Sequence, residues 1–488
     1  MISPSIDLRA RAHQAMVEAG FRPDFSPQIL QTVQAMKQQP SPGATPETRD
    51  LRALLWSSID NDTSRDLDQI EYTERGADGS TRLLIGIADV DWAVAKGSPT
   101  DAQAAFETTS VYTGVSTFPM LPAELSTDIT SLVDQQDRKA LVIELNVFTS
   151  GEVGHYDVYP ALVKNRAKLA YSSTGAWLEG RGSMPSAIAA VPGMETQLRM
   201  QLELSTQLRT LRKKQGALTF GSIEPVPVMD DGQVKDLQVS PHNVAQDIIE
   251  SFMVAANVAM ARYLTDQGSL SIRRVVRTPR RWDRIQVIAA QYGAKLPAEP
   301  DSSALCEFLD QRRAADSLNF PDLSLSIVKL LGPGEYTVDS PGNESQGHFG
   351  LAVHDYTHST APNRRFADLV TQRLLKSAAA KRPGPYAEPE LKQIAEHCTE
   401  REDAARKVER LMRKIIAASS LSRRIGEVFD GVVTGASPKG TYVRLLHFPA
   451  EGRVIRVTQG IDVGDRVKVR LASVEVSKGF IDFERING

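Results

Sequence analysis

SIDNDTSRDLDQI, residues 58–70, sets four carboxylates within nine positions, at Asp60, Asp62, Asp66 and Asp68. The stretch lies between two apolar runs, the second at Leu83–Val90. Carboxylates this close repel one another unless a cation or an arginine neutralises them, and Mg²⁺ and Mn²⁺ prefer oxygen ligands. Asp66 and Asp68 share one side of any extended segment, because side chains alternate along it. The pattern favours a cation site over its alternative, a solvated acidic turn between strands.

The composition describes a soluble protein of more than one domain. A length of 488 residues predicts two or three domains, and 41% hydrophobic with 24% charged residues is typical of globular proteins. No apolar run reaches the roughly 18 residues that span a bilayer, and the N-terminus lacks the pattern of a secretory signal. The two cysteines, Cys306 and Cys398, are far apart, which argues against a disulfide framework or a structural zinc. We therefore expect a cytoplasmic protein without a membrane segment, working as a monomer.

Basic residues are concentrated in strips although the net charge is only −3. This balance lacks the overall basic signature of small nucleic-acid-binding domains. The strips lie at Arg273-Arg274, Arg280-Arg281, Arg364-Arg365, Arg413-Lys414 and Arg423-Arg424. Local positive strips on a nearly neutral protein suit a groove that follows phosphates.

The first 45 residues predict a short helical module. Helices are expected over residues 6–19 and 26–36, the second opening with Ser26 as N-cap and Pro27 as first helical residue. A further short helix is expected from Thr45 to Trp56. The module resembles a helix-turn-helix or winged helix.

Residues 46–423 predict a central mixed α/β domain, so the fold class is α+β. Apolar runs at 83–88 and 140–147 indicate buried strands, and apolar periodicity indicates helices at 194–212, 243–264, 366–379 and 391–416.

Residues 424–488 change character, because glycines and β-branched residues alternate at the spacing of short strands and turns. This predicts a five-stranded barrel, with another small all-β domain as the alternative.

A second polar constellation lies far downstream, at His348–Asp368, where a loop rich in threonine, serine and arginine opens a helix. Such a helix entrance is a good anion site. Taken alone, Arg364 and Arg365 would be an ordinary surface pair. Beside a carboxylate-held cation, however, an arginine provides what phosphodiester hydrolysis needs.

Four motifs in order carry a specific resemblance. They are Ile59–Ile70, Ile87-Ala88-Asp89-Val90, Phe118–Ser126 and Asp355–Asp368. Together they resemble the ribonuclease II family of exoribonucleases over residues 50–488. The order Gly426-Glu427-Val428, Lys439–Val443, Glu451-Gly452 and Val463–Val469 resembles an S1 domain, an oligonucleotide-binding barrel that implies contact with single-stranded RNA.

The resemblance implies roles for individual residues. Asp60, Asp66, Asp68 and Gln69 correspond to the metal site, Asp68 to the essential carboxylate, and Arg364 to the catalytic arginine. RNA contacts are implied for Tyr112 and Phe220, which would clamp the last bases, and for Tyr171, Glu250, which would contact the terminal ribose, and Arg365.

Three departures from the family pattern qualify these roles. The family has a further aspartate where this chain has Gln69, so the site holds one negative charge fewer, and Asp62 could compensate only from a loop that turns inward. The late helix offers Glu402 and Glu409, neither of which aligns with the family's acidic residue, so one ion or two is left open. The N-terminus is too short for the family's paired cold-shock-like barrels.

The function implied is a Mg²⁺-dependent exoribonuclease, with Mn²⁺ as an alternative ion, that degrades single-stranded RNA processively from the 3′ end to nucleoside 5′-monophosphates. One alternative is a non-catalytic RNA-binding or regulatory protein with a decayed site. Another is a phosphatase of small molecules, against which the S1-like barrel argues.

Overall fold

The computed structural model describes residues 6–38, 46–221, 225–230, 233–239, 242–342, 346–437, 440–446, 448–456, 460, 463 and 465–486. Lys439 and Gly464, two residues of the predicted barrel pattern, lie outside these ranges.

The two predicted N-terminal helices are present as α1 (Leu8–Glu18) and α2 (Pro27–Lys37). The side chain of Asp7 caps the first by accepting two backbone N–H groups, and Ser26 caps the second. The helix predicted from Thr45 to Trp56 is wrong. Its described part forms turns and the two-residue strand β1 (Arg49–Asp50), because pairing with strand β8 of the central sheet satisfies this backbone instead.

The central domain is built on a curled sheet of six strands, ordered β1-β8-β2-β3-β4-β7, in which β8 also pairs with β7. Its strands are β2 (Trp56–Asp60), β3 (Gln69–Arg75), β4 (Thr81–Ala88), β7 (Asp137–Val147) and β8 (Val153–Ala170). The predicted strands are confirmed as β4 and β7.

The directions of the strands bring several strand ends together at one end of this sheet. β2 runs parallel to β8, with Asp60 beside Ala170, and antiparallel to β3. β3 runs antiparallel to β4, with Gln69 beside Ile87. The ends of β2, β4 and β8 and the start of β3 therefore lie together, which places the acidic stretch at this end.

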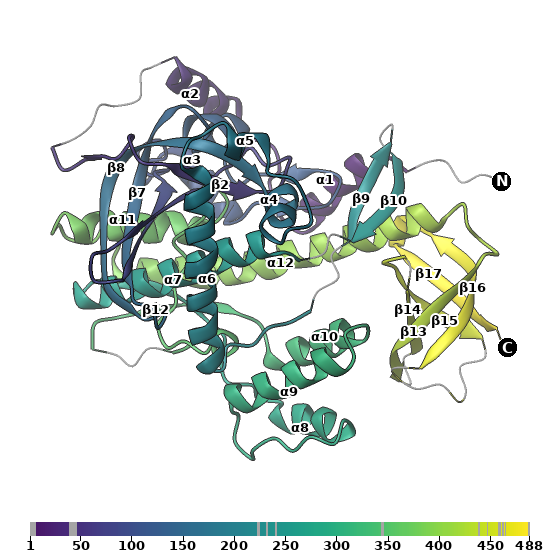
Figure 1. Cartoon of the computed structure of the whole chain (residues 1–488). Helices are drawn as coiled ribbons and strands as arrows, with labels where there is room; N and C mark the ends of the chain where they lie inside the picture. Colours follow the sequence, from purple (N-terminus) through teal and green to yellow (C-terminus); the bar gives the residue numbers. More distant parts are fainter. Residues whose placement is uncertain are drawn as a thin grey trace.

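Most of the helices lie around the sheet, and the helices of residues 282–331 form a separate group below it, with an apolar cluster of their own (Figure 1). The helices are α3 (Pro99–Glu107), α4 (Tyr171–Leu178), α5 (Ser186–Ala189), α6 (Met194–Lys214), α7 (Val244–Asp266), α8 (Trp282–Gln291), α9 (Ser302–Ala315), α10 (Phe320–Leu331), α11 (Phe366–Ala379) and α12 (Glu388–Leu421), with single turns η1 (Leu125–Ile129), η2 (Phe349–Leu351) and η3 (Val476–Lys478). Three hairpins or strand pairs are β5 (Val111–Tyr112) with β6 (Thr117–Phe118), β9 (Pro225–Asp230) with β10 (Gln233–Val239), and β11 (Ser271–Val275) with β12 (Glu335–Asp339). All four helices predicted in this domain are present, as α6, α7, α11 and α12.

Helix α7 is a core helix. Within the described residues, it is the one helix whose length and apolarity would let it cross a membrane, but 61% of its most apolar stretch is buried inside the fold. Such burial is typical of the interior of a globular protein.

The predicted C-terminal barrel is confirmed. Strands β13 (Val428–Ser437), β14 (Gly440–Leu445), β15 (Glu451–Arg456), β16 (Arg466–Glu475) and β17 (Phe480–Ile486) close into a barrel in the order β13-β14-β15-β17-β16. Gly452 permits this closure, since a Cβ there would lie 2.6 Å from the carbonyl oxygen of Ile481.

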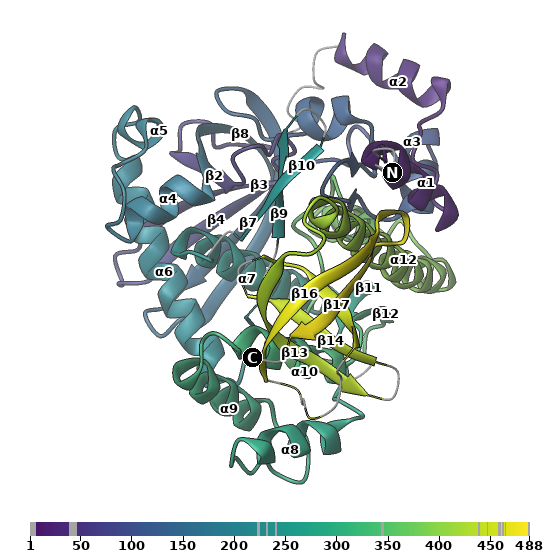
Figure 2. The ribbon, with the colours of Figure 1, turned by 90° about the vertical axis from the view of Figure 1, so that its right-hand side faces the viewer.

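Helix α12 connects the central domain with the barrel. It runs from the sheet region to the barrel in Figure 1, and Figure 2 shows the barrel in front of it. It packs against α1, β5 and β12 at one part and against β16 and β17 at another. A second connection joins the barrel to α10, where the guanidinium of Arg444 forks onto Asp322 with distances of 3.0 and 2.6 Å.

Candidate active site

The loop before α11 reaches the acidic end of the sheet because it pairs with the segment of residues 108–110, which directly follows α3. The backbone N–H of Ser110 donates to the carbonyl of Arg364 at 2.9 Å, and that of Phe366 donates to Thr108 at 2.8 Å. These bonds hold Arg364 alongside β5, which begins directly afterwards and carries Tyr112.

Asp68 is the buried centre of the site, with 2% of its surface exposed. One carboxylate oxygen accepts the backbone N–H of Asn363 at 3.1 Å, and the other lies 3.4 Å from Nε of Arg364. Burial raises the pKa of Asp68 to about 7, although the charge of Arg364 opposes this shift. Near neutral pH, a proton and a cation would therefore compete for this carboxylate.

Asp66 lies within electrostatic reach of both Asp60 and Asp68. Oδ1 of Asp60 accepts the N–H of Asn61 at 2.7 Å and the hydroxyl of Ser64 at 2.9 Å. Burial raises the pKa of Asp60, and the negative charge of Asp66 raises the pKa of both Asp60 and Asp68. The structure thus brings together the three aspartates that the sequence selected.

This set of side chains fits a hard divalent cation. All the charged donors are oxygens, and the charges of Asp68 and Asp60 raise the pKa of the Arg364 guanidinium, although its partial burial opposes this shift. Hard cations such as Mg²⁺ and Mn²⁺ prefer such oxygen ligands, and a divalent ion would balance the remaining charge.

Two neighbouring residues lie differently. Asp62 is exposed in a turn and accepts the hydroxyl of Ser172 at 3.0 Å, so the loop does not turn it inward. Gln69 is buried at the start of β3, and alternation along the strand directs it away from the side of Asp68. In the described ranges, no hydrogen bond joins Gln69 to the aspartates, and its role as a metal ligand stays a prediction.

Two tyrosines flank the acidic residues. Tyr112 is 43% exposed, and its hydroxyl lies within electrostatic reach of Arg364. Burial raises the Tyr112 pKa to about 12, although Arg364 opposes the shift. Tyr171 begins α4 directly after β8, and its pKa is raised by burial and by the charges of Asp60 and Glu71.

Phe220 and Glu250 lie on other elements. Phe220 packs against the apolar cluster of α8, α9 and α10, and among the described residues no ring contact joins it to Tyr112. Glu250 lies on α7, 3.8 Å from the guanidinium of Arg212. The predicted clamp would therefore form only with RNA bound, with a base between Tyr112 and Phe220 and the terminal ribose beside Glu250.

Other charged groups near the site are already paired. Arg365 forks onto Asp368 at 2.8 and 2.7 Å, so its predicted contact with RNA would compete with this carboxylate. Glu402 accepts a similar fork from Arg274. Glu409 reaches β5, where it accepts the backbone N–H of Tyr112 at 3.1 Å. Glu402 and Glu409 thus serve structural contacts.

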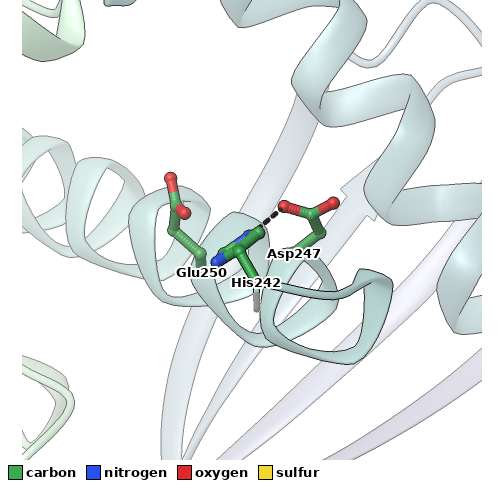
Figure 3. A group of neighbouring side chains, drawn as sticks. All are labelled: His242, Asp247 and Glu250. Atoms are coloured by element: carbon green, nitrogen blue, oxygen red, sulfur yellow. Dashed lines mark hydrogen bonds and ion pairs between the residues drawn. The ribbon is translucent and has the colours of Figure 1, made fainter. Parts of the chain in front are cut away.

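A second group of potential ligands was not foreseen from the sequence. His242, Asp247 and Glu250 bring one ligand atom each within 4.8 Å of one another (Figure 3). Nε2 of His242 lies 2.7 Å from Asp247, which also receives the guanidinium of Arg209. The spacing of His242 and Asp247 across a helix start was the available signal.

The fold and the site together define a class of protein with two joined domains. The chain joins a mixed α/β domain, with a buried acidic site and an arginine at one end of its sheet, to an OB-type barrel. More particularly, the chain belongs to the RNB domain family: residues 48–381 match the RNB domain, and residues 427–486 match the RNase II-type exonuclease C-terminal S1 domain.

Relatives agree with this membership, and solved structures share the fold. The chain is 28% identical to ribonuclease R of Escherichia coli (strain K12), over 99% of this chain and 62% of the relative, and 31% identical to ribonuclease R of Thermotoga maritima, over 83% and 57%. It therefore spans about three fifths of the length of these proteins. Its fold is similar to that of Mycoplasma genitalium RNase R in complex with ribose-methylated single-stranded RNA, with TM-score 0.88, 22% identity and coverage of 98% and 78%. It is also similar to yeast Ssd1, a pseudonuclease, with TM-score 0.70, 17% identity and coverage of 91% and 55%.

Proposed function

We propose that this chain is a divalent-metal-dependent exoribonuclease that degrades single-stranded RNA processively from the 3′ end and releases nucleoside 5′-monophosphates, with Mg²⁺ as its ion and Mn²⁺ as a substitute. One observation carries the proposal. Asp68 is buried beside Asp60 and Asp66 at one end of the sheet, and Asn363 and Arg364 hold it from the opposite part of the chain. Membership of the RNB family and the relatives named ribonuclease R support the choice of RNA.

Each residue has a chemical task in this proposal. Asp60, Asp66 and Asp68 would hold the ion, which when bound would polarise a phosphoryl oxygen and lower the pKa of a water molecule. Arg364 is half exposed beside Asp68, so its guanidinium is available to stabilise the charge that develops on the phosphate. The main-chain N–H of Asn363 holds the carboxylate of Asp68 in place and would keep it oriented toward the ion.

The aromatic residues would position the RNA end. Tyr112 is exposed and fixed beside Arg364, so a base stacked on its ring would bring its phosphate to the arginine. Tyr171 lies where further bases would pass, and Phe220 and Glu250 would close the far side of the last nucleotides. The S1 barrel would bind the strand before it enters.

We extend the proposal to the organisation of the chain. Residues 1–45 form a helical module, 46–423 the catalytic domain and 424–488 the S1 domain, and the protein acts in the cytoplasm as a monomer. Light scattering after size exclusion would test the last point, because a second copy would double the mass.

Product analysis tests the activity. Poly(A) labelled at the 5′ end and poly(A) labelled at the 3′ end are incubated with the full chain, with and without Mg²⁺. The 3′ label is expected to appear at once as AMP, while the 5′ label stays on long RNA until a short end product forms. Internal cleavage, or release that continues in excess EDTA, would contradict the proposal.

The alternative is an RNA-binding protein without catalysis. The observation that favours it is Gln69, which supplies no charge where the family has an aspartate. It predicts that the protein binds poly(A) in a gel-shift assay and releases no nucleotide with either ion.

A further inference from the structure

The loop before α11 is closed by one buried carboxylate. Asp368 lies in the first turn of α11 and has no exposed surface. Its Oδ1 accepts the backbone N–H groups of Thr360 and Ala361 at 2.9 and 2.8 Å. The guanidinium of Arg365 donates to Oδ1 at 2.7 Å and to Oδ2 at 2.8 Å. These four hydrogen bonds use about all the lone-pair sites of a carboxylate, so Asp368 acts within the protein rather than on a metal ion or RNA.

The bonds to Asp368 join the two ends of one tight turn. The carbonyl of Ala361 accepts the backbone N–H groups of Arg364 at 3.2 Å and of Arg365 at 3.0 Å, which makes residues 361–365 a compact turn. Asp368 binds the N–H at the start of this turn and the side chain at its end. A change at either end would therefore displace the residues between them.

The residues inside this turn are the ones that contact the acidic site. The N–H of Asn363 donates to Asp68 at 3.1 Å, and Nε of Arg364 lies 3.4 Å from the other oxygen of the same carboxylate. Both contacts depend on the shape of the turn. A shift of about 1 Å would break the first contact and weaken the second.

The two neighbouring arginines have different surroundings. Arg364 has 47% of its side chain exposed and lies beside Asp68, whereas Arg365 has 28% exposed and donates two hydrogen bonds to Asp368. A phosphate could bind Arg365 only by competing with these bonds, and it would leave the buried charge of Asp368 without its cation, which is costly. One guanidinium is therefore available to RNA, and the other shapes the loop.

We propose that Asp368 and Arg365 are positioning residues of the active site, which act on the reaction through the placement of Asn363 and Arg364 against Asp68. This inference rests on the proposed exoribonuclease function and deepens it. It gives Arg365 a role inside the protein in place of the RNA contact expected from the sequence.

Steady-state kinetics on 5′-labelled poly(A) tests the inference. Asp368→Asn keeps the shape of the side chain, removes its charge and turns an NH₂ group toward one of the donors. We expect kcat to be about 10²-fold lower, since a displacement of about 1 Å in a catalytic group has an effect of this size. KM, and the affinity for poly(A) measured in EDTA, should stay within about twofold, because the residues that bind the strand lie elsewhere. A loss of stability alone would not divide the effect in this way.

Arg365→Gln tests the other partner. It also covers the case in which Asp368→Asn does not fold, because it leaves the two backbone hydrogen bonds of Asp368 in place. We expect kcat to be about tenfold lower, with the salt dependence of poly(A) binding unchanged. A phosphate contact of Arg365 would instead make the slope of log K against log salt shallower by about 1 in this variant.

A double variant shows whether the effect passes through Arg364. Adding Asp368→Asn to Arg364→Ala should lower kcat by less than about tenfold, because the guanidinium to be placed is already gone. Independent effects of the two substitutions would multiply and would contradict the inference.

Hydrogen–deuterium exchange gives a readout without catalysis. Loss of the acceptor in Asp368→Asn should speed the exchange of the Thr360 and Ala361 amides by about tenfold or more. Asp101→Asn is the matched control, since Asp101 is a buried carboxylate that lies 2.8 Å from the guanidinium of Arg373, further along α11. This control should lower Tm without changing kcat or the exchange of the loop.

The outcomes separate this inference from the proposed function. If the unaltered protein degrades poly(A) and Asp368→Asn retains its kcat, the inference is wrong and the proposed function stands. The same holds if Arg365→Gln changes only the affinity for poly(A) and its salt dependence. If the unaltered protein releases no nucleotide, the proposed function fails, and the inference fails with it even where exchange of the loop responds to Asp368→Asn.

Discussion

Two groups of carboxylates in this molecule look alike by proximity and differ in charge balance. Asp247 and Glu250 lie beside His242 on the outer part of α7, and each already has a cationic partner, in Arg209 and Arg212. Although burial opposes the shift, the hydrogen bond from His242 and the charge of Arg209 lower the pKa of Asp247. The hydrogen bond to Asp247 in turn raises the pKa of His242.

The aspartates at the end of the sheet are in the opposite state. Burial raises the pKa of both Asp60 and Asp68, and Arg364 is the one guanidinium among the groups acting most strongly on them. The comparison teaches that short distances between ligand atoms do not make a cation site. Uncompensated charge, held in place by buried backbone, distinguishes the site that would gain from an ion.

The largest effect is expected from Asp68→Asn, which keeps the side-chain shape and removes the buried charge. We expect activity on poly(A) to fall by about 10³-fold or more, in line with the loss of a group that stabilises the transition state. Asp247→Asn is the matched substitution in the other group and should retain activity. Circular dichroism must show both variants folded, and substantial activity of Asp68→Asn would remove the distinction between the groups.

The second-largest effect is expected from Arg364→Ala. Its kcat should be about 10² to 10³-fold lower, because the guanidinium stabilises the charge that develops in the transition state. Arg364→Lys should recover only part of this loss, since lysine keeps the charge but not the planar fork. Steady-state kinetics on 5′-labelled RNA measures both. An effect confined to KM would instead make Arg364 a binding residue.

Ion binding should depend on pH through Asp68. Its pKa of about 7 in the metal-free protein means that a proton competes with the cation below pH 7, so Mn²⁺ affinity should fall about tenfold per pH unit between pH 7 and 5.5. The raised pKa also means that the folded state binds this proton more tightly than the unfolded state. Tm of the metal-free protein should therefore decrease as pH rises from about 4 to about 7. Asp68→Asn should weaken both dependences, and calorimetric titrations with melting curves would show whether it does.

The smallest effect is expected at the exposed group. His242→Gln should lower stability by at most about 1 kcal/mol, as usual for a partly exposed ion pair, and leave Mn²⁺ affinity within about twofold. Urea unfolding and Mn²⁺ titration measure the two quantities. A tenfold loss of affinity in His242→Gln would make this group a second cation site and overturn the comparison.

Much of the fold followed from local pattern. Apolar periodicity located α6, α7, α11 and α12, because each of these helices buries one regular face. The spacing of glycines and β-branched residues predicted the five-stranded barrel. The helix expected between Thr45 and Trp56 failed, since its sequence has helix-start signals but its backbone pairs with β8. Tertiary pairing overrode the local preference there.

The candidate site could be predicted from the sequence only in part. The spacing of the aspartates and the resemblance selected Asp60, Asp66, Asp68 and Arg364. The burial of Glu71 could not be predicted either, because a single acid between Ile70 and Tyr72 is what an exposed strand position would show. Arg365 was selected beside Arg364, yet the structure pairs it with Asp368.

By itself, then, the sequence determined the types of element, the acidic stretch and the loop that opens α11, because these depend on residues close together in the chain. The tertiary structure decided which charges meet. Asp68 and Asn363 are 295 positions apart and share a hydrogen bond only because the loop before α11 pairs with the segment between α3 and β5. Burial is likewise a property of packing, and burial raises the pKa of Asp68, whereas the partners of Asp247 lower the pKa of that carboxyl group.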